Sequence, residues 1–76
     1  MNNPRRKSLA RLREQIEEIQ ASLEELLDDE QEYLDNIPEN LQGSERCEKA
    51  EEAVSVLEVA ISNLEEAVEN IDSAIE

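Results

Sequence analysis

The stretch from Cys47 to Ala74 decides the fold, because it reads CEKAEEA, VSVLEVA, ISNLEEA and VENIDSA, four consecutive heptads in one frame. With the heptad positions written a to g, position a is Cys, Val, Ile and Val, position d is Ala, Leu, Leu and Ile, and position g is always Ala. Apolar side chains at a and d are typical of a helix that packs along another helix. The sequence therefore predicts a long helix over residues 44–75.

A second heptad frame precedes this stretch and predicts a helix over residues 4–35. Asn3 is a favoured N-cap residue, and Pro4 fits the first helical position because its missing N–H would be unpaired there. Pro38 ends the helix, because the residue before a proline is pushed out of the α region. Position a of the frame is Leu9, Ile16, Leu23, Glu30 and Ile37, and position d is Leu12, Ile19, Leu26 and Tyr33.

The segment between the two frames, residues 36–43, predicts a short loop with a helical turn near Pro38 to Leu41. Gly43 permits a turn and Ser44 can cap the next helix. A short loop makes the two helices antiparallel neighbours. In a register where paired residue numbers sum to 80, every a position faces a d position.

This register predicts particular pairs in the core. Leu23 with Leu57 and Ile19 with Ile61 should each share a core layer, and Glu30 should face the small Ala50. The predicted fold class is all-α: a single domain, residues 1–76, that forms an antiparallel two-helix coiled-coil hairpin and dimerises into a four-helix bundle.

The composition excludes most catalytic and metal-binding chemistry. The 76 residues contain no His, one Cys and one Gly, so a zinc site built from His and Cys, a Ser-His-Asp triad and an internal disulfide are all excluded. The carboxylates near Asp28 lack the glycine and ligand spacing of an EF-hand loop. We therefore expect a protein that is not an enzyme and has no cofactor or metal.

No run of 18 apolar residues exists, so we expect no transmembrane helix. The N-terminal residues lack the apolar segment of a secretory signal. The sequence therefore favours a cytoplasmic protein with Cys47 reduced.

Apolar residues beside the predicted seam indicate self-association. Position e of the first helix holds Leu27 and Leu34, and position g of the second helix holds Ala53, Ala60 and Ala67. A single seam between two helices would leave these residues exposed to solvent, so we expect a homodimer that covers them. A partner protein that covers them is the alternative. Val56 and Val59 are either ordinary surface valines or a second small patch.

The charge distribution is asymmetric. The basic residues cluster in the first 13 positions, as Arg5, Arg6, Lys7, Arg11 and Arg13. They have two interpretations: pairing with the acidic end of the second helix, Arg11 near Glu69 and Arg5 to Lys7 near Asp72 and Glu76, or a small contact with nucleic acid or membrane. The first is favoured, because a strongly acidic body would repel both nucleic acid and anionic lipid.

The acidic residues also have two interpretations. From Glu14 to Glu45 the chain carries 12 acids and no Lys or Arg. They either keep a small bundle soluble or imitate a phosphate backbone, since −14 charges on a rod of ~45 Å approach, in a dimer, the density of duplex DNA. The second interpretation predicts a protein partner with a basic surface and no direct binding of nucleic acid or membrane. Its candidate contact residues are Glu24, Glu25, Asp28, Glu32, Glu51, Glu58 and Glu65.

The phrase DNIPENLQGSERCEKAEEA, from Asp35 to Ala53, resembles a phrase in small acidic two-helix proteins encoded in bacterial and phage genomes. The resemblance covers the loop, the start of the second helix and the acidic heptads that follow. It implies no established activity. It implies a phage or mobile-element setting, in which small acidic proteins, such as anti-restriction and anti-CRISPR DNA mimics, often bind host proteins. A structural or adaptor coiled coil that binds a partner helix through its apolar flank is the alternative.

Overall fold

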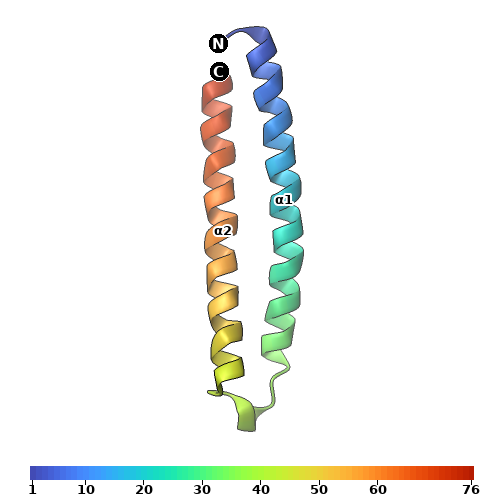
Figure 1. Ribbon diagram of the computed structural model, residues 1–76, viewed down its shortest axis with the longest axis vertical. Helices are drawn as coiled ribbons and strands as arrows, with labels where there is room; N and C mark the ends of the chain where they lie inside the picture. Colours follow the sequence, from blue (N-terminus) through green and yellow to red (C-terminus); the bar gives the residue numbers. More distant parts are fainter.

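The computed structural model describes residues 1–76 and contains two long helices that run antiparallel (Figure 1). α1 spans Asn3–Asp35, the 3-10 turn η1 spans Glu39–Leu41, and α2 spans Glu45–Ile75. The two helices lie side by side along their whole length, with both chain termini at the same end (Figure 1). The molecule is a rod with extents of 60 × 15 × 13 Å. The predicted all-α helical hairpin is confirmed.

The helix starts follow the capping chemistry of the sequence, with one correction. The N-cap of α1 is Asn2 and not Asn3, because the Asn2 side chain accepts a hydrogen bond from the Arg5 backbone N–H at 2.9 Å. Pro4 lies in the first turn, where its missing donor costs nothing, so the helix begins one residue earlier than expected. Ser44 caps α2 as expected and accepts from the Cys47 N–H at 3.3 Å.

The loop closes the hairpin through one buried residue and one glycine. Ile37 is 7% exposed and covers the end of the interhelical seam. η1 follows directly after Pro38, in the segment where a helical turn was expected. Gly43 has a φ of +88°, a left-handed conformation that residues with a Cβ rarely adopt. The chain can therefore reverse into α2 within a few residues.

The core belongs mainly to α2. Its five buried residues are at most 8% exposed: Cys47, Ala50, Val54, Ile61 and Val68. No residue of α1 is buried to that degree. Four of the five occupy position a, and the fifth, Ala50, occupies position d.

The expected role of position d in α1 is wrong. Leu12, Ile19, Leu26 and Tyr33 are 44–57% exposed, and Ile19 therefore does not share a buried layer with Ile61. α1 is turned about its axis so that positions a and e face α2 instead. The half-buried residues at position e include Arg13, Gln20, Leu27 and Leu34. Arg13 and Gln20 form hydrogen bonds to α2 there, and the two leucines cover the seam, so these contacts hold the turned orientation.

This orientation of α1 changes which apolar side chains are exposed to solvent. Leu27 and Leu34, expected to form an exposed flank, are half-buried, whereas position d carries the exposed side chains. Glu30 and Ala50, the two residues expected to face each other across the seam, line one hollow together with Tyr33. Neither α1 nor α2 has a segment that is both apolar and long enough to cross a membrane.

Candidate acidic interface

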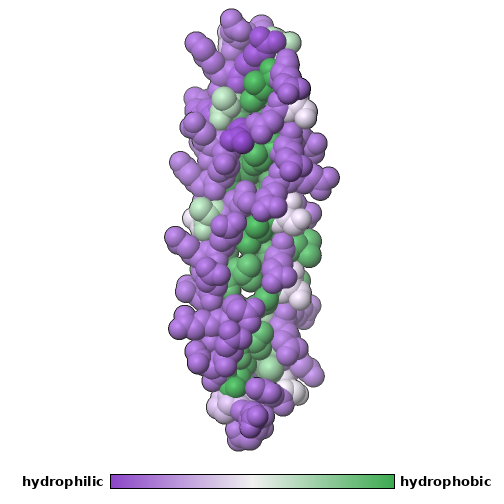
Figure 2. All heavy atoms as spheres, turned by 180° about the vertical axis from the view of Figure 1, so that it is seen from behind, coloured by the Kyte–Doolittle hydropathy of each residue, from purple (hydrophilic) through white to green (hydrophobic).

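Two helices that pack side by side leave a groove on each side of the seam along which they meet. Hydrogen bonds from Arg13 to Asp72 and from Gln20 to Glu65 cross one of them, which we call the acidic groove. Tyr33, Arg46 and Ala50 line a hollow in the other, which we call the alanine groove. Seen from one side, apolar side chains form a narrow line between hydrophilic borders that extend along the whole rod (Figure 2).

A line of carboxylates from α2 borders the acidic groove. Glu51, Glu58, Glu65 and Asp72 are all exposed and lie seven residues apart. Seven residues are about two helical turns, so these side chains point in one direction at intervals of ~10 Å. Glu65 accepts a hydrogen bond from the Gln20 side-chain amide at 3.2 Å, which fixes the line beside α1.

α1 adds carboxylates to the same side. Glu24 lies four residues after Gln20, and Asp28 lies four residues after Glu24, so all three share one ridge of the helix. Gln20 contacts α2 across the acidic groove, so the ridge starts at the groove. Glu24 and Asp28 lie progressively further from the groove on the surface of α1. The structure brings Glu24 and Asp28 onto the side that carries Glu51, Glu58 and Glu65.

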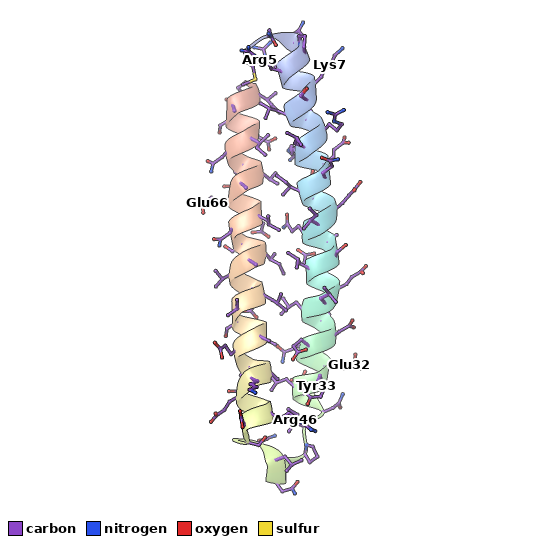
Figure 3. All side chains as sticks on the ribbon, viewed as in Figure 1. Arg5, Lys7, Glu32, Tyr33, Arg46 and Glu66 are labelled. Carbon is purple, nitrogen blue, oxygen red and sulfur yellow. The ribbon has the colours of Figure 1, made fainter.

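Two of the expected contact residues do not join this surface. Glu32 points away from α2, off the outer edge of α1 (Figure 3). Glu25 lies seven residues earlier and therefore on the same line of the helix. The expected group of seven acids is thus divided between one face and one edge, because each step of four residues from Gln20 turns about 40° further from α2, so that Glu32 points outward. We call the five that remain together, Glu24, Asp28, Glu51, Glu58 and Glu65, the acidic face.

Arg13 neutralises one end of the acidic groove. Its guanidinium donates to Asp72, with an Nη2–Oδ2 distance of 3.1 Å, and also pairs with Glu17 on the next turn of α1. The hydrogen bond to Asp72 is the main cause that raises the pKa of Arg13 above its ordinary value. Neither Arg11 nor the segment from Arg5 to Lys7 forms the expected ion pairs with Glu69, Asp72 or Glu76. Arg13 and Asp72 both occupy position e, and matching the e positions would have found the pair from the sequence.

The remaining polar groups do not form an enclosed site. Cys47 is buried, and its thiol contacts a Glu51 carboxylate oxygen at 3.7 Å beside an open hollow near the loop. Lys49 pairs with Glu45 at 3.2 Å on an exposed surface. No group of three carboxylates or thiolates lies close enough together to hold a metal ion.

Fold and charge pattern together define the class: an acidic, all-α helical hairpin with coiled-coil packing. Comparison with family models, with curated proteins and with solved structures finds no match to this chain. Function is therefore inferred from the geometry of the chain itself.

Proposed function

We propose that this protein is a non-enzymatic interaction module that inserts its acidic face into the basic groove of a nucleic-acid-binding protein. The observation that carries the proposal is the segregation of charge: Glu51, Glu58 and Glu65 form one exposed line beside the ridge of Glu24 and Asp28. A basic groove built for a phosphate backbone requires anions in a row on a rigid rod, and two packed helices provide such a rod.

The charge density supports the same interpretation. A net charge of −14 along a 60 Å rod is one charge per ~4.3 Å, against about one per 1.7 Å for duplex DNA. Two rods side by side would carry one charge per ~2.1 Å, which is close to the DNA value. The phage or mobile-element setting implied by the loop phrase is one in which such inhibitors of host proteins occur.

The acidic face acts as a group. Each exposed ion pair contributes only about 0–1 kcal/mol, so no single carboxylate dominates binding. Affinity should fall steeply as salt rises, because the contacts are electrostatic and exposed. The partner should not bind this protein and nucleic acid at the same time.

A matched pair of charge reversals tests the proposal. Glu58→Lys with Glu65→Lys alters the acidic face, whereas Glu52→Lys with Glu66→Lys makes the same change of net charge on the outer edge of α2, where Glu66 points away from α1 (Figure 3). Partners captured from a host lysate on the wild-type protein are identified by mass spectrometry, purified, and challenged with a short DNA duplex.

We expect the duplex to displace the wild-type protein, the acidic-face variant to lose binding, and the edge variant to retain it. All three proteins should keep the same helical circular dichroism spectrum. A partner that binds protein and duplex simultaneously, or that tolerates Glu58→Lys with Glu65→Lys, would contradict the proposal.

A second candidate function is a structural or adaptor coiled coil. It is favoured by the exposed apolar side chains of α1 at position d, and by Val56 and Val59, which are 59% and 58% exposed. An adaptor that binds a partner helix through these residues would tolerate both charge reversals and high salt. It would lose binding when the apolar residues become polar.

A further inference from the structure

A line of large apolar side chains on α1 has no partner within the hairpin. Leu12, Ile19, Leu26 and Tyr33 are 47%, 54%, 57% and 44% exposed. They lie seven residues apart, so they form a straight line of ~32 Å along the rod. We call this line the exposed stripe. A line of exposed large apolar side chains of this length on a small protein is typical of an interaction site.

The exposed stripe borders the alanine groove, and small residues lie on the opposite border. Tyr33 and Arg46 line the same hollow, so these two residues lie at about the same height on the rod. Steps of seven residues along the antiparallel helices then bring Leu26 level with Ala53, Ile19 level with Ala60, and Leu12 level with Ala67. One face of the rod therefore carries a line of large side chains next to a line of alanines.

Beyond Glu45, which lines the hollow near the loop and pairs with Lys49, the same face of α2 carries no acid. In steps of seven residues along α2, Arg46 is followed only by alanines. In the same steps, Lys49 is followed by Val56, Asn63 and Asn70. Every acid of α2 after Glu45 lies on position b, e or f of the heptad, toward the acidic groove or the outer edge. Two chains that each carry −14 can approach closely only where carboxylates do not meet, and this face satisfies that condition on α2.

We propose that a second copy of this chain covers the exposed stripe, related to the first by a twofold axis along the rod, with both loops at the same end. Rotation about the long axis leaves the height of each residue unchanged and puts α1 of one copy over α2 of the other. Leu12, Ile19 and Leu26 then pack onto Ala67, Ala60 and Ala53 of the second copy. Tyr33 lies over Arg46 of the second copy, a favourable pairing of a ring face with a cation.

The alternative twofold axis, across the rod, fits less well. It would put α1 over α1 and the loops at opposite ends. Large side chains would then meet large ones and alanines would meet alanines, which leaves gaps where close packing is required.

The size of the face suits a stable dimer. A side of the rod measures about 60 × 15 Å, or ~900 Å², and a stable interface buries about 800 Å² per partner. The dimer is a four-helix bundle in which both acidic faces stay outside. The inference therefore does not depend on the function proposed for those faces.

Sedimentation equilibrium on matched variants tests the surface. Leu26→Gln and Val59→Gln replace side chains that are 57% and 58% exposed, and glutamine is a good helix former, so both monomers should fold. We expect Leu26→Gln to weaken dimerisation by about 10-fold or more, and Val59→Gln to change it by less than about 2-fold. Ala60→Leu, which fills the space opposite Ile19, should weaken it in the same way.

Double electron–electron resonance tests the orientation. A spin label on Gln42→Cys, in a background where the buried Cys47 is replaced by alanine, lies at the loop end. Loops together give a distance between labels that is far shorter than the 60 Å rod, and loops apart give a distance near the rod length. A long distance would overturn the orientation. The proposed dimer surface would be refuted if sedimentation shows only monomer at low and high salt, or if Leu26→Gln and Val59→Gln have equal effects. The exposed stripe would then be left to bind a partner helix.

Discussion

Two isoleucines on facing helices should respond very differently to the same substitution. Ile61 of α2 is 8% exposed and Ile19 of α1 is 54% exposed, although a simple heptad reading puts both in one core layer. Ile61→Ala and Ile19→Ala each remove three carbon atoms, so the difference between their effects reports directly on the orientation of α1.

The expected magnitudes follow from burial. Three fully buried carbons are worth about 2.4 kcal/mol, at about 0.8 kcal/mol for each CH₂ group. Ile61 is almost fully buried, so Ile61→Ala should lose nearly all of this burial energy. Alanine gains about 0.4 kcal/mol in helix propensity, and the net cost should therefore be about 2 kcal/mol. Ile19 retains less than half, so its net cost in the monomer should be about 0.7 kcal/mol.

Urea unfolding followed by circular dichroism measures both values through linear extrapolation. At the lowest protein concentration that gives a signal, the ratio of the two costs should be about three. If a second copy covers the exposed stripe as we propose, the cost of Ile19→Ala should grow as concentration rises, since association stabilises the folded state by mass action. Equal costs at low concentration would refute the turned orientation of α1.

Three smaller predictions concern the seam and the loop. Glu30→Leu should raise the free energy of unfolding by about 1 kcal/mol, because it fills the half-buried hollow opposite Ala50; a loss of stability would argue against that pairing. Ser44→Ala should cost about 1 kcal/mol in the same urea assay, because the Cys47 N–H loses its acceptor, and Ser44→Asp should restore it. Gly43→Ala should cost about 1–2 kcal/mol from backbone strain alone, since nothing lies within 4 Å of the added Cβ; Gly43→Asn should cost less, because asparagine tolerates the left-handed region.

The sequence by itself determined the two helices, their antiparallel arrangement and the loop that joins them. Apolar residues every three or four positions leave no other regular structure for these segments, and Pro38, Gly43 and Ser44 define where the chain turns. The helix caps were also determined by local sequence. The N-cap of α1 is Asn2 where Asn3 was expected, so the capping signal placed the helix start to within one residue.

Only the tertiary structure decided how α1 is rotated about its axis. A heptad frame identifies an apolar stripe several positions wide, and positions d, a and e of α1 all belong to it. The choice between d and e depended on contacts across the chain, namely Arg13 with Asp72, Gln20 with Glu65, and the packing of Leu27 and Leu34. That rotation exposes Ile19 and Leu26, and it turns the line of Glu25 and Glu32 directly away from α2. The physical reason is that a helix fixes the angles between its own side chains, whereas the direction in which the whole set points is fixed only by what packs against it.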